Sequence, residues 1–253
     1  MASYTDPVTR SPRTLVVIPA LNEEAALPLV LEELAHHAPE CDVLVIDDGS
    51  TDDTANVARA CGARVVSLPF NMGVGTALRT GFRFAVRNGY DRVVQTDADG
   101  QHDAREIHRL VAALDDGADL VIGSRFVARD GHYQVERSRG AAMGILRGFT
   151  VVLLGRRIHD STSGFRGFSA PLTKAFSRTY PREFLSDTVE ALLMASYGGF
   201  RVDEVPVRMR TRAGGEPSHR SLRLYYHYLR LLVVMTLTAS LDARRVLRRE
   251  AAR

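Results

Sequence analysis

Short apolar runs alternate with longer segments of helical periodicity over the first 125 residues. The runs, rich in Val, Ile and Leu, are 15–18, 43–46, 65–66, 93–94 and 120–122. Their apolar residues are consecutive rather than alternating, which is typical of parallel strands buried on both faces. The segments with apolar residues at helical spacing are about 24–37, 52–61, 73–88 and 103–114. The pattern predicts a doubly wound α/β fold with helices on both faces of the sheet.

The pattern changes after residue 125. Residues 126–140 are polar and Arg-rich and predict a loop, and 155–167 is rich in Ser, Thr, Gly and Arg. Further elements expected from the periodicity are helices near 141–154, 170–178 and 187–197 and a last strand at 202–209. The domain boundaries that follow are a disordered N-terminus at 1–13, a globular domain at 14–218 and a separate C-terminal helix at 219–253.

Polar and Gly-rich residues occupy the ends of the predicted strands. These clusters are 19–24, 47–50, 71–73, 97–99 and 123–125. Taken singly, each is an ordinary turn or helix cap, and Ser50 is placed to cap the helix that follows it. The carboxyl ends of parallel strands meet at one edge of a sheet, so the five clusters together favour a binding site there.

Asp97 and Asp99 follow the apolar run at 93–94. Two carboxylates at positions i and i+2 of an extended chain point to the same side of the backbone. Such a pair suits a hard divalent cation, which prefers oxygen ligands and keeps water and substrate phosphates as the others. Gln101 could add a further oxygen. A metal at this position would bridge a diphosphate and neutralise it as a leaving group.

Two other clusters fit parts of a nucleotide. The carboxylates of residues 47–48 can accept hydrogen bonds from a nucleobase or a ribose, and Gly49 lets the chain turn. Residues 71–81 open a helix with small side chains, whose N-terminus could approach a phosphate. Close packing of this helix on the sheet explains Gly75 and Ala77 at least equally well.

Six motifs occur along the chain in an order and spacing that point to a known family. They are Pro19-Ala20-Leu21-Asn22-Glu23-Glu24, Asp47-Asp48-Gly49-Ser50, Asn71-x-Gly73, Asp97-Ala98-Asp99-Gly100-Gln101-His102, Gly123-Ser124-Arg125-Phe126 and Thr162-Ser163-Gly164-Phe165-Arg166. As a set they resemble family 2 glycosyltransferases with the GT-A fold, most closely the polyprenyl-phosphate (dolichol-phosphate) sugar synthases. The resemblance covers about residues 14–220 and implies a mixed, mainly parallel sheet.

The resemblance also implies roles for individual residues. The nucleotide sugar would bind to Pro19, Asn22, Glu23, Asp48, Ser50, Asn71, Gly73, Asp97 and Ala98. Mg²⁺ or Mn²⁺ would be held by Asp97, Asp99 and Gln101. The acceptor phosphate would meet Arg125, Arg137 or Arg139, and Ser218. The catalytic groups would be Asp99, Arg125 and Arg212. The family's Arg-x-x-Gly-x-Ser-Lys element is one residue longer here, at 212–219, and ends in His219 instead of Lys.

A phosphate acceptor agrees with the side chains present. A sugar hydroxyl needs a general base, whereas a phosphate monoester is mostly dianionic near pH 7, its second pKa being about 6. No dedicated base stands out in 126–220, since Asp187 and Glu190 equally suit an exposed helix start. We therefore expect inverting transfer of a sugar from a GDP- or UDP-sugar to a polyprenyl phosphate. The alternatives are transfer to a saccharide hydroxyl and an inactive membrane-surface binding module.

The C-terminal segment is strongly basic. Residues 201–253 contain 12 Arg and 5 acidic residues, a net charge of +7, whereas the whole chain carries +3. The uncharged stretch 231–241 is 11 residues long, shorter than the roughly 20 that a membrane span requires. Aromatic, aliphatic and Arg residues over 220–249 predict a helix lying in an anionic membrane interface. A helix packed on the core or on a partner is the alternative, and the aliphatic content disfavours nucleic acid.

Two cysteines, Cys41 and Cys61, provide no disulfide framework and predict buried free thiols in a reducing compartment. The polar N-terminus lacks the apolar region of a signal peptide. We expect peripheral attachment at the cytoplasmic face of the plasma membrane, or recruitment to it by a small membrane-spanning partner protein.

Overall fold

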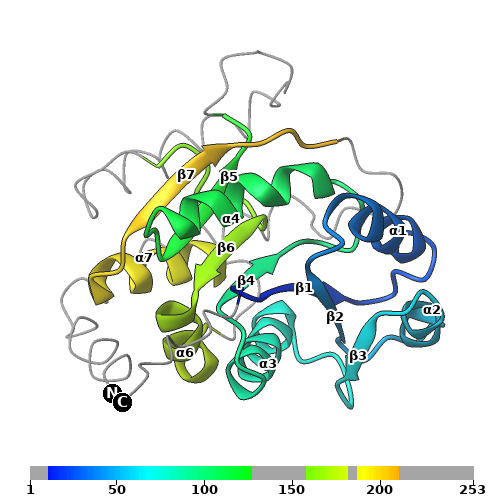
Figure 1. Cartoon of the computed structure of the whole chain (residues 1–253). Coiled ribbons are helices and arrows are strands. Elements are labelled where there is room, and N and C mark those ends of the chain that lie inside the picture. The colour runs from blue at the N-terminus through cyan, green and yellow to red at the C-terminus, as the bar shows by residue number, and fades with distance from the viewer. Residues whose placement is uncertain (1–10, 127–157, 182–186, 211–253) are drawn as a thin grey trace, which may run out of the picture.

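The computed structural model describes residues 11–126, 158–181 and 187–210. They form a seven-stranded sheet with the strand order β3-β2-β1-β4-β6-β5-β7 (Figure 1). The strands are β1 (Thr14–Ala20), β2 (Asp42–Asp47), β3 (Arg64–Ser67), β4 (Arg92–Gln95), β5 (Leu120–Ser124), β6 (Arg166–Ser169) and β7 (Val202–Pro206). The five apolar runs of the sequence lie in β1 to β5; those of β1, β4 and β5 are buried between the layers of helices, that of β2 is mostly buried, and that of β3 at the edge of the sheet is partly buried.

One strand runs against the others. The pairs β1–β2, β1–β4, β2–β3 and β5–β7 are parallel, whereas β6 is antiparallel to both β4 and β5. Arg166, the first residue of β6, lies opposite Gln95 and Ile122. The segment that precedes β6 consequently reaches the edge at which the parallel strands end.

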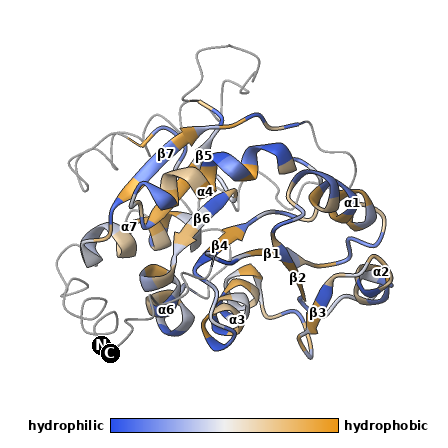
Figure 2. Ribbon diagram, in the orientation of Figure 1, coloured by the Kyte–Doolittle hydropathy of each residue, from blue (hydrophilic) through white to orange (hydrophobic). Residues whose placement is uncertain are grey.

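Helices cover both faces of the sheet. Their bounds are α1 (Leu27–His37), α2 (Thr54–Ala60), α3 (Val74–Arg87), the 3-10 turn η1 (Ala104–Glu106), α4 (Ile107–Asp115), α6 (Ala170–Thr179) and α7 (Asp187–Gly198). One core layer joins α3, α6 and α7 to the sheet, and the other joins α1, α2 and α4 to its opposite face. Figure 2 shows α3 and α6 with one hydrophobic and one polar side.

The contact of α3 with the sheet explains its small residues. A Cβ atom added to Gly81 would lie 2.5 Å from a methyl group of Val17 on β1. Gly75 and Ala77 of the same helix are also buried. The packing interpretation of these residues is therefore the one that the structure favours.

The predicted fold class is confirmed, with corrections in detail. No strand was expected at 166–169, where β6 lies. The last strand ends at Pro206, and Met209 instead forms an isolated bridge with His102. Cys61 is exposed and Cys41 is partly buried, so the prediction of two buried thiols is wrong for Cys61.

Two further features concern the ends of the domain. Arg13 donates to Asp42, to the carbonyl of Asn88 and, through its backbone N–H, to Asp91, so it is anchored beside the start of the sheet. Within the described part of the chain, no helix is long and apolar enough to cross a membrane. The helices expected at 141–154 and 219–253 lie outside the described residues.

Candidate active site

A pocket opens at the carboxyl ends of β1, β2 and β4. Its walls come from these strand ends and from the loop between β3 and α3. The lining residues are Pro19, Ala20, Leu21, Glu23, Asp48, Asn71, Val74, Asp97, Ala98 and Asp99. The structure thus brings together most of the residues expected to bind a nucleotide sugar. This follows from the parallel arrangement, which directs the ends of these strands to one edge.

Asp48 holds the loop between β3 and α3 that forms one wall of the pocket. Its side chain is buried, and its two carboxylate oxygens accept hydrogen bonds from the backbone N–H groups of Met72 and Gly73, each at 2.8 Å. Burial raises the pKa of Asp48, and the two amide donors oppose that shift. Asp48 therefore shapes the loop that presents Asn71 to the pocket, in addition to lining the pocket itself.

Asn22 and Ser50 hold two loops together instead of lining the pocket. The Asn22 N–H donates to Ser50 Oγ at 3.0 Å, and Asn22 Oδ1 accepts from the Thr51 N–H at 2.8 Å. The Glu23 N–H donates to Thr54 Oγ1 at 2.8 Å across the same boundary. The prediction that Ser50 caps the following helix is wrong, because its hydroxyl group is engaged with Asn22 and α2 begins after Asp53.

Asp97 and Asp99 both line the pocket, although residues 98–99 form a turn and not the extended chain that the sequence argument assumed. Asp99 is buried and its Oδ1 accepts from the Gln101 N–H at 3.0 Å. The Asp97 side chain is 40% exposed. Over the described ranges no three His, Cys, Asp or Glu side chains gather to form a metal cluster. Two carboxylates beside an open pocket suit a divalent cation that takes its remaining ligands from substrate phosphates and water.

The segment before β6 completes one side of the site. A Cβ atom added to Gly164 would lie 3.0 and 3.1 Å from the carboxylate oxygens of Asp97. The Gly123 N–H, near the end of β5, donates to the carbonyl oxygen of Phe165 at 2.8 Å. Gly164 therefore leaves room for the Asp97 side chain, and β5 fixes the backbone beside it.

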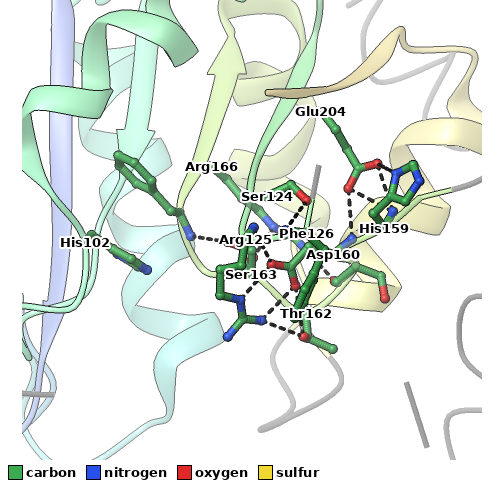
Figure 3. Close-up of polar contacts among 12 residues, drawn as sticks. His102, Ser124, Arg125, Phe126, His159, Asp160, Thr162, Ser163, Arg166 and Glu204 are labelled. Atoms are coloured by element: carbon green, nitrogen blue, oxygen red, sulfur yellow. Dashed lines mark hydrogen bonds and ion pairs between the residues drawn. The ribbon is translucent and has the colours of Figure 1, made fainter. Parts of the chain in front are cut away.

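Arg125 is held by a buried carboxylate (Figure 3). Its Nε and Nη2 atoms donate to the two oxygens of Asp160, each at 2.7 Å, and its backbone N–H donates to the same group at 3.1 Å. The Asp160 side chain is 0% exposed and that of Arg125 is 20% exposed. This bidentate geometry fixes the guanidinium orientation.

Glu204 supports Asp160 from β7. Its carboxylate accepts from the backbone N–H groups of His159 and Asp160 at 2.8 to 3.0 Å, and lies 3.0 Å from His159 Nδ1 (Figure 3). Arg166 is fully buried and donates to the carbonyl oxygens of Ser161, Ser163 and Thr188. These contacts hold residues 159–163 in one conformation.

Sequence reasoning gave no role to Asp160 or Glu204. The 162–166 motif pointed to this region, but its placement depends on β6, which was not expected. Gly73 and Gln101 do not line the pocket but donate backbone N–H groups to Asp48 and Asp99, which do. The remaining residues expected at the site, Arg137, Arg139, Arg212 and Ser218, lie outside the described residues.

Solved structures with a related fold include glucosyl-3-phosphoglycerate synthase from Mycobacterium tuberculosis. Its complex with Mn²⁺, UDP-glucose and phosphoglyceric acid has a TM-score of 0.66 and 25% identity, covering 90% of this chain and 80% of that chain. Its complex with Mn²⁺, UDP and phosphoglyceric acid has a TM-score of 0.68 and 24% identity, covering 90% and 78%. These likenesses agree with the predicted GT-A fold.

The sequence comparisons identify the family. Polyprenol monophosphomannose synthase of Mycolicibacterium smegmatis is 35% identical over 219 residues, covering 83% of this chain and 83% of the relative. Undecaprenyl-phosphate mannosyltransferase of Micrococcus luteus is 34% identical over 212 residues, covering 81% and 86%. The profile described as "Glycosyl transferase family 2" matches residues 15–176. The chain therefore belongs to glycosyl transferase family 2 and is a glycosyltransferase, with relatives in the polyprenyl-phosphate sugar synthase branch that its motifs resemble.

Proposed function

We propose that this enzyme transfers a sugar, with inversion, from a GDP- or UDP-sugar to a polyprenyl phosphate in a reaction that depends on a divalent metal. The observation that carries the proposal is the pocket at the strand ends, where Asp97 and Asp99 face the loops of Pro19, Asp48 and Asn71. A pocket lined by an acidic pair and by loops at the ends of parallel strands suits a nucleotide diphosphate bound through a metal.

The donor would be bound by residues of β1, β2 and the loop before α3. Pro19 and Glu23 line one wall, and Asp48 and Asn71 line another. Asn22, Ser50 and Gly73 act on the donor through the loops that they hold in place. Ala98 is buried between the two acidic residues and also lines the pocket.

The acidic pair fits a divalent cation. Asp97 and Asp99, with Gln101 as a further oxygen donor, would hold Mg²⁺ or Mn²⁺, whose charge stabilises the departing diphosphate. Carboxylate and carbonyl oxygens are ligands that suit Mg²⁺ and Mn²⁺, which supports this assignment. A protein of the same fold has been crystallised with Mn²⁺ and UDP-glucose, which agrees with it.

The acceptor assignment rests on chemistry and on the relatives. A phosphate monoester attacks as an anion and needs no dedicated base. Arg125, held by Asp160, supplies a fixed cation for such a group, and Arg137 or Arg139, Arg212 and Ser218 are the further contacts that the family motifs imply. The two relatives named above are a polyprenol monophosphomannose synthase and an undecaprenyl-phosphate mannosyltransferase. The basic segment 220–249 would attach the enzyme peripherally to the cytoplasmic face of the membrane, either directly or through a small membrane-spanning partner protein.

A transfer assay tests the proposal. The full chain is incubated with Mn²⁺, undecaprenyl phosphate in detergent micelles and a panel of radiolabelled GDP- and UDP-sugars, and the lipid phase is counted. We expect one sugar nucleotide to label the lipid, and chelation or Asp97→Asn to abolish that label. Label in added saccharides but not in lipid would favour the hydroxyl acceptor instead. Absence of both transfer and donor hydrolysis would favour the inactive binding module.

A further inference from the structure

His102 ends the acidic motif without being one of the expected metal ligands. Its side chain is 4% exposed and lies beside Asp97. The backbone N–H of Asp97 donates to His102 Nδ1 at 3.0 Å, and Thr96 Oγ1 lies 3.2 Å from the same nitrogen. Because an amide N–H can only donate, Nδ1 is the acceptor and carries no hydrogen. The ring hydrogen is therefore on Nε2, which lies 3.6 Å from Asp97 Oδ2.

Two further contacts hold the side chain and the backbone of His102. Phe165 stacks on it with the ring centroids 4.9 Å apart and the planes 16° from parallel. The His102 backbone forms a bridge with Met209, and the Arg210 N–H donates to the neighbouring Gln101 carbonyl at 2.8 Å. Phe165, before β6, thus fixes the ring, and the segment after β7 fixes the backbone that carries it. The imidazole in turn lies next to Asp97 at both its backbone and its carboxylate.

We propose that His102 is a positioning residue, which sets the backbone and the carboxylate of Asp97 for metal binding through its two ring nitrogens. The Nδ1 contact has ordinary hydrogen-bond length, whereas the Nε2 contact is longer. Fixing the backbone of Asp97 is therefore the larger part of the role. This inference rests on the proposed metal site, because Asp97, which His102 positions, is one of the ligands proposed there.

Three substitutions separate positioning from packing. Asn can place its side-chain oxygen close to the position of Nδ1 and so keeps the acceptor. Gln can place its amide nitrogen near the position of Nε2 and so keeps the donor. Phe keeps the ring that stacks on Phe165 but has neither nitrogen. If His102 only fills space, His102→Phe is the mildest change and His102→Asn is the most harmful; positioning predicts the reverse order.

The measured quantity is the affinity of the full chain for Mn²⁺. Electron paramagnetic resonance monitors the binding, with Mn²⁺ alone and with GDP or UDP present. We expect His102→Phe to weaken binding about tenfold or more, His102→Asn to stay within about threefold of wild type, and His102→Gln to lie between them. The matched control is the exposed His108 of α4, where His108→Phe should leave binding unchanged. Far-ultraviolet circular dichroism and the melting temperature identify any variant that has unfolded.

The outcomes distinguish the two proposals. Equal Mn²⁺ affinity of wild type and a folded His102→Phe variant would overturn the positioning role while leaving the metal site intact. Stronger loss in His102→Asn than in His102→Phe would also overturn it, in favour of packing. Absence of Mn²⁺ binding by the wild type, alone and with either nucleotide, would overturn the metal site and the role of His102 with it.

Discussion

Arg125 at the end of β5 is paired in bidentate fashion with Asp160, whose side chain is fully buried. The pair joins two segments that are 35 residues apart in the sequence. Glu204 on β7 holds the backbone of Asp160, so the orientation of Arg125 depends on both β5 and β7. A guanidinium restrained in this way is pre-oriented for an anion, but part of its charge is already offset by the carboxylate.

Asp160→Asn should therefore affect both stability and acceptor binding. The variant leaves the Arg125 guanidinium without its anionic partner and with one fewer acceptor oxygen. Breaking a buried ion pair in this way costs about 3 kcal/mol of unfolding free energy, measured by urea denaturation. Below its melting temperature, the variant should show a raised KM for the lipid phosphate and a nearly unchanged KM for the sugar nucleotide. A folded variant with normal acceptor KM would show that Arg125 does not contact the acceptor.

Thr162→Val is the matched control for this pair. Thr162 Oγ1 lies 3.3 Å from Arg125 Nη2 and 3.4 Å from Asp160 Oδ1, at the long end of hydrogen-bond length. Its loss should cost no more than about 1 kcal/mol and should leave the ion pair in place.

Gly164→Ala should weaken metal binding without unfolding the protein. The added Cβ atom would lie 3.0 Å from one carboxylate oxygen of Asp97 and 3.1 Å from the other, which displaces the carboxylate by a few tenths of an ångström. Because ligand geometry controls metal affinity, we expect the Kd for Mn²⁺ to rise about tenfold. Titration calorimetry with Mn²⁺ measures the change.

The control for Gly164→Ala is Gly167→Ala on β6. There the added Cβ atom would lie 3.1 Å from a methyl group of Leu114, in the core and away from the carboxylates. It should lower the melting temperature by overpacking and leave the Mn²⁺ Kd unchanged. Equal loss of Mn²⁺ affinity in both variants would mean that general loosening of the site, and not displacement of Asp97, is responsible.

The sequence allowed the parallel half of the sheet to be predicted, because burial on both faces leaves a continuous apolar run in β1, β2, β4 and β5. It did not indicate β6. That strand begins with Arg166, and its largest apolar residue is Phe168. Residues 166–169 become a strand through pairing with β4 and β5 on either side, which is a tertiary effect that local propensity does not contain.

The same limit applies to the site. Because Asp48, Asp97 and Asp99 follow predicted parallel strands, the sequence placed them at one edge of the sheet, and all three line the pocket. It could not show that Asn22 and Ser50 bond to each other across 28 residues, since that contact depends on the register of β1 and β2. The role of Asp160 depends in turn on β6 and on Glu204 of β7.

Gly49→Ala should disrupt the donor side of the pocket. Gly49 has a φ of +74°, and an added Cβ atom would lie 2.4 Å from the carbonyl carbon of Phe70. The left-handed conformation costs an Ala residue about 1 to 2 kcal/mol, and the backbone contact adds to that cost. We expect a loss of about 3 kcal/mol in urea denaturation, together with weaker nucleotide binding, because Asp48 could no longer hold the loop at residues 70–73.

Gly62→Ala provides the comparison for Gly49→Ala. Gly62 has a φ of +82°, but nothing lies within 4 Å of the added Cβ atom. Its cost should be limited to about 1 kcal/mol, with nucleotide affinity unchanged. If the two variants lost equal stability, the predicted contact between Gly49 and Phe70 would be wrong.

Asp42 should give the protein a stability increment that disappears in acid. The Tyr90 hydroxyl group donates to its carboxylate at 2.8 Å and Arg13 Nη2 donates at 2.9 Å, and these two contacts lower the pKa of Asp42 in the folded state. A carboxyl group with a lowered folded pKa stabilises the protein above its unfolded pKa of about 3.9, and loses that effect as the pH falls through the folded pKa.

Asp42→Asn should therefore reduce the unfolding free energy at pH 7, by no more than about 1 kcal/mol because solvent screens this half-exposed pair. The difference between wild type and variant should shrink as the pH falls below the unfolded pKa and vanish once the pH is below the lowered folded pKa, in parallel urea titrations at several pH values. Asp42 lies at the start of β2, at the edge opposite the pocket, so nucleotide affinity at pH 7 should be the same in both proteins. A stability difference that persisted unchanged in acid would show that the carboxylate charge is not its source.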